Sequence, residues 1–332
     1  MSEIYIIAFE SSCDDTSVAL YEQNSGLVHY LTHSQNSTHE KYGGVVPELA
    51  SRDHIAVCLA LLDKVLNESG VDIKDIASVA YTAGPGLIGS LLVSASVAAG
   101  IALGLGVNLI PVHHLEGHLL SPFLTEEIVY PFIMLLVSGG HTLLVKVSGY
   151  RKYDVLGGTL DDSAGECLDK SAKLMGLSFP GGPAIEQQAV FGDPLSIPLP
   201  HPLKNQGFNF SFSGLKTAIR RKWDQGADKN NLCASVQAKV IEVLLDKALY
   251  ALKHEEVSRL IVVGGVSANK ALRKSFLGAM KHHGYDVIFP DMRFATDNAA
   301  MIAQAASMMI QESVTVVNDL KMNPRWPLDA VS

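Results

Sequence analysis

The sequence has few cysteines and few charges, and nothing in it marks an export segment. Its four cysteines (Cys13, Cys58, Cys167 and Cys233) are scattered along 332 residues without a CxxC pair. This argues against a disulfide framework and against a thiolate zinc site, and it is typical of the reducing cytosol. The first residues, MSEIYIIAFE, enter a strand pattern directly, without a basic region or an Arg/Ser-rich transit segment. We therefore expect a cytoplasmic protein.

Charge is absent altogether between Asp75 and Glu116. Within this interval, LIGSLLVSASVAAGIALGLGV is long enough to span a bilayer. The stretch is rich in Gly, Ser and Ala, no Lys/Arg cluster flanks it, and its pattern divides into a helix followed by a strand. These features predict a buried core helix and no association with a membrane.

The composition is that of a large globular protein with an acidic balance. Hydrophobic residues make up 48% and charged residues 18% of the chain, enough for a sizeable core and for two domains. The net charge of −8 argues against a general nucleic-acid coat protein, because phosphate binding needs local positive charge. The densest basic stretch, KTAIRRKW at 216–223, is by default a solvated helix face.

Strand-like and helical patterns alternate along the chain and predict an α/β protein. IYIIAF and TSVALY read as strands joined by ESSCDD, and PFIMLLV and LLVKV as strands joined by SGGHT. Two hairpins of one design indicate a duplicated domain. Between them, Ile55, Leu59, Leu62 and Leu66 recur at helical spacing and predict an amphipathic helix. The hydrophobic pattern breaks near residues 120–130, where we place the domain boundary.

The stretch PVHHLEGHLL contains two histidines four residues apart. If residues 113–124 are helical, His114 and His118 lie on one face with Cβ atoms about 5–6 Å apart, within reach of one ion. They could also be ordinary surface histidines, but the apolar surroundings favour a metal site. ATDNAAM offers Asp297 as a third ligand at a helix start, where the alternative role is an N-cap. Two histidines and an aspartate suit zinc or ferrous iron.

A zinc protease is the obvious alternative, and the spacing tests it. Such enzymes use HExxH, in which the glutamate directly follows the first ligand and activates bound water. Here Glu116 stands two residues after His114, about 200° around the helix, so it points away from the ion. A protease would therefore lack its base.

Three turns of small or acidic residues follow predicted strands. They are FESSCDDTS with Glu10, Ser12 and Asp14, LLVSGGHT with Ser138, Gly139 and Gly140, and VVGGVSAN, where Ser267 or Asn269 can cap the next helix. Each is a weak signal alone, since most such turns are only turns. Glycine turns nevertheless let backbone N–H groups approach an anion closely. Together the turns indicate a nucleotide held between two α/β lobes.

A series of motifs then resembles one family almost from end to end. In order they are ESSCDDTS, YGGVVPELASRDH, AYTAGPGLIGSLLV, PVHHLEGHL, LLVSGGHT, DDSAGECLDKSAKLMGL, FPGGP, FSFSGLKT, VVGGVSANKALR, TDNAAMIA and RWPL. This order is similar to the TsaD family, long called glycoproteases, which makes threonylcarbamoyladenosine in tRNA. The two histidines together with SGGHT and GGVSAN are the most specific of these motifs.

The resemblance implies an actin-like, ASKHA (ribonuclease H-like) α/β fold of two lobes with a nucleotide and metal cleft. The N-terminal lobe would comprise residues 1–125, completed by about 295–332, and the C-terminal lobe residues 126–294. Family members transfer the threonylcarbamoyl group of threonylcarbamoyl-AMP to the 6-amino group of adenine 37, in tRNAs that read codons starting with A.

The resemblance also implies residue roles and partners. The metal, iron or zinc, would be held by His114, His118 and Asp297. The substrate would be held by Leu136, Val137, Ser138, Gly139, Gly140, Asp169, Gly182, Glu186 and Asn269. Glu186 stands where many relatives have Asp, and Cys167 has no assigned role. AMP, ADP or ATP could also occupy the cleft. The implied partners are tRNA, the paralogue TsaB, the ATPase TsaE, and TsaC as supplier of the activated intermediate.

This chemistry needs no protein nucleophile, because AMP is a stabilised leaving group and the metal can polarise the acyl carbonyl. Glu10, Ser12 and Asp14 are the further candidate residues of the cleft. A non-catalytic scaffold would have lost the metal ligands, and an actin-like kinase would not need paired histidines. Since the chain is acidic, we expect tRNA to bind detectably only when the partners are present.

Overall fold

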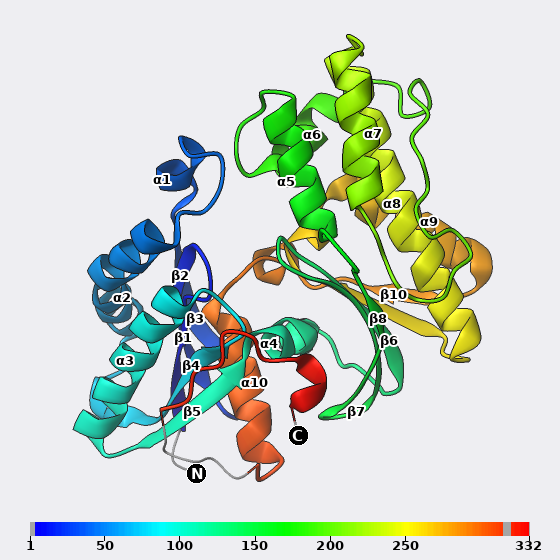
Figure 1. Ribbon diagram of the computed structural model, residues 1–332. Helices are drawn as coiled ribbons and strands as arrows, with labels where there is room; N and C mark the ends of the chain where they lie inside the picture. The colour runs from blue at the N-terminus through cyan, green and yellow to red at the C-terminus, as the bar shows by residue number, and fades with distance from the viewer. Residues whose placement is uncertain (1–3, 315–319, 332) are drawn as a thin grey trace. The chain divides into compact units, whose positions relative to one another are not determined.

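The chain folds into two compact α/β units. The computed structural model describes residues 4–314 and 320–331. Within these ranges, unit 1 comprises residues 4–128, 296–314 and 320–331, and unit 2 comprises residues 129–295 (Figure 1). The boundaries expected from the sequence were 125/126 and 294/295. Unit 1 is thus built from both ends of the chain, and unit 2 is continuous.

Unit 1 contains a mixed sheet with the strand order β3-β2-β1-β4-β5. Strand β2 runs antiparallel to both β1 and β3, whereas β4 and β5 run parallel to β1. The strands are β1 (Tyr5–Glu10), β2 (Asp15–Glu22), β3 (Gly26–Ser34), β4 (Ile76–Gly84) and β5 (Asn108–His113). The helices are α1 (Asn36–Glu40), α2 (Pro47–Ser69), α3 (Ile88–Leu105), α4 (His114–Leu120) and α10 (Ala299–Gln311), with short 3-10 turns η1 (Ile73–Asp75), η2 (Ser121–Leu124) and η5 (Leu328–Ala330).

Helices cover both faces of this sheet, which explains why its central strands are apolar throughout. On one face, Ile7 and Phe9 of β1 pack into a core with α2 and α3. On the other face lies α10, whose first N–H group, from Ala299, donates to Ser17 Oγ at 2.9 Å. Tyr21 donates from the same strand face to Gln304 Oε1 at 2.9 Å. Residues from the end of the chain therefore complete the sheet formed by its beginning.

The helix predicted after the first hairpin is α2, but the predicted core face was wrong. Ile55 and Leu59 are 65% and 54% exposed, whereas Leu62 is 4% exposed. The buried face is centred on His54 and Cys58 instead. His54 accepts or donates a hydrogen bond with Thr16 Oγ1 at 2.7 Å and lies 3.0 Å from the Cys13 carbonyl. The buried face of α2 therefore includes a histidine that is held by polar partners. The spacing of apolar residues does not predict such a face.

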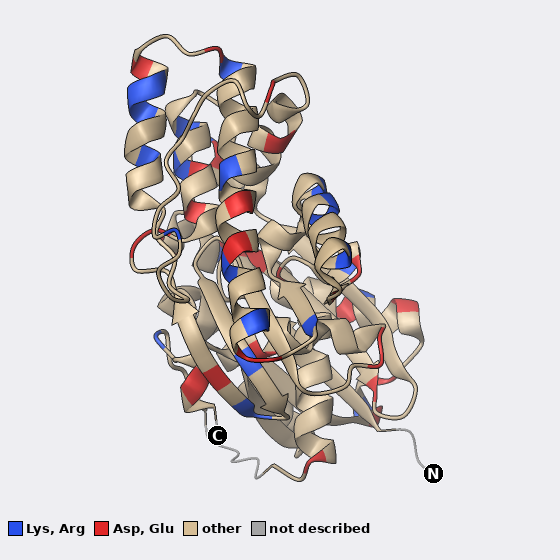
Figure 2. Ribbon diagram, turned by 90° about the vertical axis from the view of Figure 1, so that its right-hand side faces the viewer, with Lys and Arg blue, Asp and Glu red and all other residues tan. Residues whose placement is uncertain are grey.

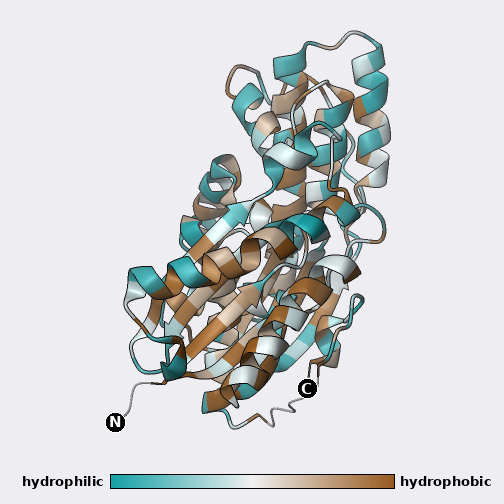
Figure 3. Cartoon of the chain, turned by 90° about the vertical axis from the view of Figure 1, so that its left-hand side faces the viewer, coloured by the Kyte–Doolittle hydropathy of each residue, from teal (hydrophilic) through white to brown (hydrophobic). Residues whose placement is uncertain are grey.

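The uncharged stretch forms α3 and β5, as predicted. Among the described residues, α3 is the one helix long and apolar enough to cross a membrane by length and composition. Its buried side chains include Ala95, Ala98 and Ala102, which pack in the core beside β4 and α2. Its outer face carries apolar residues as well, with Leu103 85% exposed (Figure 3). Half of this helix is thus a core element of unit 1.

Unit 2 has a second sheet with the order β10-β9-β6-β7-β8. Its strands are β6 (Phe132–Val137), β7 (Thr142–Gly149), β8 (Lys152–Gly158), β9 (Arg259–Val263) and β10 (Asp286–Ile288). Read from β8 to β10, their order and directions match those of β3 to β5 in unit 1. The predicted duplication is therefore confirmed at the level of topology.

Five helices of unit 2 share one core with its sheet. They are α5 (Ala164–Leu174), α6 (Gly181–Ala189), α7 (Ser213–Asp224), α8 (Lys229–His254) and α9 (Lys270–His283), with the 3-10 turns η3 (Gly265–Ala268) and η4 (Met292–Phe294). Ile133 and Leu135 of β6 lie in this core with Phe210 and Phe212 from the segment before α7. Large aromatic and aliphatic side chains thus fix the frame on which the glycine turns are held.

Two helix starts were predicted, one correctly. Asn269 caps α9, since its Oδ1 accepts from Leu272 N at 2.8 Å. The last helix is capped by Asn298, which accepts from Met301 N at 3.0 Å, and not by Asp297. Asp297 therefore lies one residue before the cap, and its carboxylate is not committed to the helix end.

The segment 320–331 runs along β4 and β5 as a strap with little regular structure. Tyr81 of β4 donates to the Lys321 carbonyl at 2.8 Å and accepts from Lys321 N at 2.9 Å. The strap passes so close to Gly84 that a Cβ there would lie 1.9 Å from the Asn323 carbonyl oxygen. Gly84 also has φ +142, a backbone conformation that side chains rarely adopt. Glycine is therefore required at this position.

Replacing Gly84 with Ala should destabilise unit 1, because the strap must move and the backbone becomes strained. We expect a loss of at least about 1–3 kcal/mol in the free energy of unfolding, measured by urea denaturation. Gly104→Ala is the matched control: Gly104 lies inside α3 with nothing within 4 Å of the new Cβ. That change should be neutral or stabilise by up to about 1 kcal/mol. Equal midpoints for the two variants would contradict the close approach.

Candidate metal and substrate site

The helix with the paired histidines begins directly at the end of a buried strand. His113 is the last residue of β5 and the N-cap of α4, and its Nδ1 accepts from Leu115 N at 3.1 Å and from Glu116 N at 3.4 Å. The α-helix covers His114–Leu120, and the rest of the predicted helical segment is the 3-10 turn η2. Every residue of α4 is buried. The two histidines are thus core residues, not members of a surface helix.

His114, His118 and Asp297 come together in unit 1. His118 Nε2 lies 3.0 Å from Asp297 Oδ1, and His114 Nε2 lies 3.7 Å from the same oxygen. The two imidazole rings are 4.8 Å apart at an angle of 83°. One ligand atom from each residue falls within 4.8 Å of the other two. Residues that are 179 positions apart in the sequence therefore present two nitrogens and one oxygen to a common point.

Gly117, a residue without a side chain, allows His114 and His118 to lie close to Asp297. Gly117, between the histidines, faces α10 so closely that a Cβ would lie 2.9 Å from Ile302 Cδ1 and 3.2 Å from Met301 Cγ. Since α4 and α10 touch at this glycine, the residues just before α10 reach the histidine face of α4. The glycine in HLEGH therefore determines the distance from the histidines to Asp297.

The other nitrogen of His114 is held by the loop after β1. His114 Nδ1 lies 3.1 Å from Glu10 Oε2 and 3.2 Å from Ser12 Oγ. Glu10 is fully buried and also accepts from Ser12 N at 2.6 Å and from the hydroxyl of Thr82. A carboxylate on the outer nitrogen fixes the ring so that Nε2 points towards Asp297, as is usual for metal-binding histidines. Thr82 was missed by the sequence reasoning, because nothing distinguishes it within a buried strand.

The loop after β1 is itself fixed onto the start of α3. Leu87 N donates to the Ser12 carbonyl at 2.8 Å, and Ser90 Oγ donates to the Cys13 carbonyl at 3.1 Å. A Cβ on Gly86 would lie 2.6 Å from the Ser12 carbonyl oxygen. The GPG turn is therefore glycine-rich because the loop that supports His114 lies directly on it.

Charges in this cluster shift one another's protonation. Burial would lower the pKa of His114, but Glu10 and then Asp297 outweigh it and raise the pKa to about 9. Burial would raise the pKa of Glu10, but the neighbouring His114 outweighs it and holds the pKa below its ordinary value. The two residues thus form a buried imidazolium–carboxylate pair near neutral pH.

Two further carboxylates extend the negative charge. Burial, and next to it the charge of Asp297, raises the pKa of Asp15 to about 7. Burial also raises the pKa of Asp14, and Asp297 adds to that shift. Asp14, a predicted cleft residue, thus lies within the field of Asp297, although the described contacts join only Glu10 and Ser12 to His114. An excess of carboxylates over positive groups is an environment that favours a bound cation.

The donor set fits a zinc or ferrous ion. Bonds of about 2.0–2.1 Å to tetrahedral ligands place the ligand atoms about 3.3 Å apart, close to the distances around Asp297 Oδ1. The ring of His118 is fully buried, and its Nε2, the atom assigned to the ion, lies 3.0 Å from Asp297 Oδ1. Glu116 is not part of the group of possible ligands.

In unit 2, the predicted substrate residues begin at the end of β6. Leu136 and Val137 are fully buried strand residues, and Ser138, Gly139 and Gly140 form the exposed turn to β7. Ser163, the N-cap of α5, donates to the Gly139 carbonyl at 2.6 Å. A Cβ on Gly165 would lie 2.5 Å from the Ser138 carbonyl oxygen, so α5 packs directly against the turn.

The remaining predicted substrate residues are linked in a series to this turn. Asp169 of α5 accepts from Gly181 N at 2.7 Å, beside Gly182. Glu186 of α6 accepts from Lys270 N at 2.7 Å, beside Asn269, whose Nδ2 donates to Gln237 Oε1 at 2.9 Å. Gly264, with φ +90, lies directly against the end of β6, since a Cβ there would lie 2.5 Å from the Val137 carbonyl oxygen. The segment that leads to Asn269 is therefore in contact with the strand that leads to the glycine turn. All nine residues thus belong to connected segments of unit 2.

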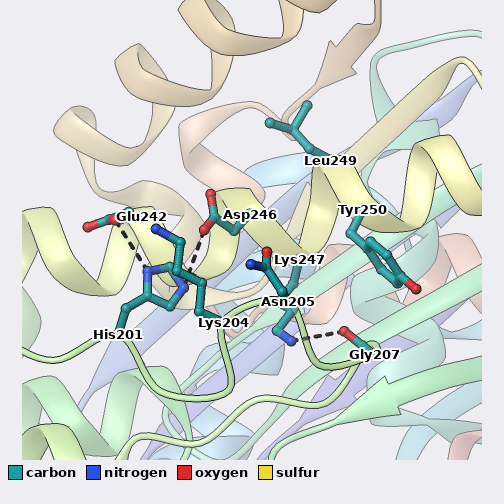
Figure 4. A pocket seen from close by; sticks show the side chains of 9 residues that line it. All are labelled: His201, Lys204, Asn205, Gly207, Glu242, Asp246, Lys247, Leu249 and Tyr250. Atoms are coloured by element: carbon teal, nitrogen blue, oxygen red, sulfur yellow. Dashed lines mark hydrogen bonds and ion pairs between the residues drawn. The ribbon is translucent and has the colours of Figure 1, made fainter.

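A second group of possible metal ligands lies elsewhere in unit 2. His201 Nδ1 is 3.2 Å from Glu242 Oε1, and His201 Nε2 is 3.3 Å from Asp246 Oδ2, at the side of a pocket of about 350 Å³ (Figure 4). The imidazole already lies between the carboxylates. Lys204 and Lys247 line the same pocket, and Lys239 pairs with Glu242. This positive charge opposes a divalent cation, so the group is better explained as a set of ion pairs.

Comparisons of the fold show an actin-like ATPase fold. Component A of (R)-2-hydroxyglutaryl-CoA dehydratase from Acidaminococcus fermentans aligns with a TM-score of 0.56 and 13% identity, over 94% of this chain and all of that one. HypF from T. kodakarensis aligns with a TM-score of 0.63 and 14% identity, over 95% of this chain and 49% of that one. At such low identity these likenesses describe the fold only.

Comparisons of the sequence show the family. A tRNA N6-adenosine threonylcarbamoyltransferase from Herminiimonas arsenicoxydans is 49% identical over 337 residues, which is 98% of each chain. One from Bordetella petrii is 48% identical and covers 97% of each. The family model described as TsaD, tRNA N6-adenosine threonylcarbamoyltransferase, matches residues 26–304. With the histidine pair and the glycine turns in place, the chain belongs to the TsaD family of acyltransferases.

Proposed function

We propose that this chain transfers the threonylcarbamoyl group of threonylcarbamoyl-AMP to the 6-amino group of adenine 37, in tRNAs that read codons starting with A. The observation that supports this most strongly is the convergence of His114, His118 and Asp297 in a chain of the TsaD family. The two relatives described above are both named tRNA N6-adenosine threonylcarbamoyltransferase. Glu116 stands two residues after His114 and not directly after it, which also argues against a peptidase.

In this proposal His114 Nε2, His118 Nε2 and the Asp297 carboxylate would hold the metal. The donor set suits zinc or ferrous iron without choosing between them. When bound, the ion supplies Lewis acidity for an acyl carbonyl and for the negative charge that develops on its oxygen. Three protein ligands leave positions open for the substrate.

The protein's own contribution in unit 1 is orientation and charge. Glu10 and Ser12 hold the His114 ring by Nδ1, so its Nε2 keeps one direction. The thiol in the loop that supports His114 is not a ready nucleophile, because burial, and next to it the charge of Asp14, raises the pKa of Cys13. Burial also raises the pKa of Cys58 and Cys167 to about 12. This agrees with direct attack by the adenine amine, with AMP as the leaving group.

Unit 2 contributes the residues that we assign to the adenylate part of the substrate. Gly139 and Gly140 are exposed, and the contact from Ser163 fixes their turn, so backbone groups can approach a phosphate without reorganisation. Glu186, which lies beside Asn269 through its contact with Lys270 N, would contact the ribose. Leu136 and Val137 position this turn through the core, since their side chains are buried in the sheet.

The partners and the compartment are also part of the proposal. A single-stranded anticodon loop can present its adenine unstacked, as RNA-modifying enzymes require. TsaB and TsaE would act as protein partners, and TsaC would supply threonylcarbamoyl-AMP. Four free cysteines agree with a cytoplasmic location.

Replacing both His114 and His118 with Ala should remove bound metal and transfer together. The experiment measures metal by mass spectrometry and modified adenosine in unmodified tRNA, with threonine, bicarbonate, ATP and the partner proteins supplied. We expect metal to fall from about one ion per chain to background, and transfer to fall at least a hundredfold, because second-shell changes alone cost 10–100-fold.

His201→Ala is the control for this experiment, because His201 belongs to the other histidine–carboxylate group. This variant should keep both its metal and its activity. Full transfer by a metal-free double variant would end the proposed role of the ion. Loss of the metal from His201→Ala alone would place the ion in unit 2.

Replacing Glu10 with Gln should lower the pKa of His114 from about 9, because the carboxylate that outweighs burial is gone. The folded pKa lies above the ordinary value of 6.5, so the pair stabilises the metal-free fold fully below about pH 6.5 and loses this effect as pH rises through about 9. In chelator-treated protein, the NMR signal of the His114 ring reports the pKa, and urea midpoints at pH 6.5 and 9.5 report stability. A Glu10→Gln variant with the wild-type titration would refute the assigned pair.

A further inference from the structure

The α9 helix carries a basic face that the site described above does not use. Between Glu256 and Asp286 there are five Lys or Arg residues and no Asp or Glu, in a chain with a net charge of −8. Four of the five lie on α9. Figure 2 shows the basic residues in blue and the acidic ones in red. An uninterrupted basic helix on an acidic protein is a local exception that calls for a partner of opposite charge.

Three lysines of α9 form one stripe. Lys270, Lys274 and Lys281 fall within about 40° of one another around the helix and extend over about 16 Å along it. All three are exposed, and none of them takes part in an ion pair within residues 4–314 and 320–331. We call Lys270, Lys274 and Lys281 the α9 basic face. Unpaired lysines held on a rigid helix are well suited to bind phosphates.

A groove lies beside the first turns of this face. Lys270, Arg273 and Lys274 line it together with Leu277 and Met292, and its volume is about 440 Å³. Leu277 and Met292 are 53% and 48% exposed, so the lining of the groove combines apolar with basic side chains. Such a lining suits a polymer in which anionic groups alternate with planar, less polar groups, because the lysines can bind the anions and the apolar side chains can contact the planar groups.

Arg273 has a structural role in the groove, because its guanidinium group is already hydrogen-bonded to backbone carbonyls. Its Nε donates to the Ser267 carbonyl at 2.8 Å, and its Nη2 donates to the Pro290 carbonyl at 3.0 Å. Asp291, which interacts electrostatically with Arg273, pairs with Arg293 at 3.0 Å. Glu186 accepts from the backbone N–H of Lys270. The lysine side chains therefore stay available to an external anion.

The other basic stretch, KTAIRRKW on α7, is less suited to this role. Lys216 is paired with Asp162 at 2.9 Å, and the stretch is followed by Asp224 and Asp228. Lys229 lies over the Trp223 ring at 5.9 Å. The acidic neighbours weaken the positive potential there, whereas no acidic residue interrupts α9.

We propose that the α9 basic face binds the sugar-phosphate backbone of tRNA. This rests on the proposed function, which supplies an RNA substrate. The face begins at Lys270, directly after Asn269 and in backbone contact with Glu186, two residues assigned to the substrate. Phosphates flanking the target nucleotide would bind the lysines, while the groove takes up ribose and base surfaces. Such contacts position the RNA and carry no sequence information.

The test is the variant Lys274→Glu/Lys281→Glu in the transfer assay with all partner proteins. We expect KM for tRNA to rise about tenfold or more, kcat at saturating tRNA to stay within about twofold, and KM for threonylcarbamoyl-AMP to stay unchanged. The slope of log KM against log salt should fall by about 2, one for each lost phosphate contact.

The matched control is Lys152→Glu/Lys253→Glu, which reverses two exposed lysines of unit 2 and changes the net charge by the same amount. Its KM for tRNA should equal that of the wild type. An unchanged tRNA KM in the α9 variant would overturn the proposal, as would equal rises in both variants or a changed response to a partner protein at unchanged tRNA KM. If the Glu variant does not fold, Lys274→Gln/Lys281→Gln should still raise KM about three- to fivefold. Failure of the wild type to modify tRNA would instead refute the proposed function.

Discussion

One carboxylate oxygen organises the chemistry of unit 1. Asp297 Oδ1 lies within 3.0 Å of one imidazole and 3.7 Å of the other, and its charge reaches the acidic loop after β1. Asp297 is only half-buried, but a charge partly removed from water is still costly unless it is paired, so this oxygen requires partners around it. The Glu10–His114 pair, the glycine between the histidines and the late cap of α10 all follow from that requirement.

Much of the fold could be predicted because hydrophobic periodicity reports burial. The strands, both hairpins, the core helix α3 and the duplication were visible in the pattern of residues. The face of α2 was not, because His54 is buried through hydrogen bonds that only the folded chain brings together. The start of α10 was also missed by one residue, since Asp and Asn cap equally well in isolation.

The candidate site shows the same limit. Helical spacing predicted that His114 and His118 share one face, and the resemblance supplied Asp297. Spacing could not predict that the whole of α4 is buried, or that Thr82 supports Glu10, because both depend on contacts between distant segments. The assignment of substrate residues in unit 2 came from the resemblance alone. It stays a prediction, although contacts now connect their segments.

The split arrangement of unit 1 has a consequence for biosynthesis. The chain must make the 167 residues of unit 2 (129 to 295) before Asp297 and the strap that holds Tyr81 leave the ribosome. Domains fold as they emerge, so unit 2 can be complete while the first sheet still lacks α10. Until α10 has been synthesised, the sheet face that α10 covers stays exposed on the nascent chain. This exposed apolar face is a binding site for chaperones. Unit 2 can therefore complete its fold before unit 1, although the synthesis of unit 1 begins first.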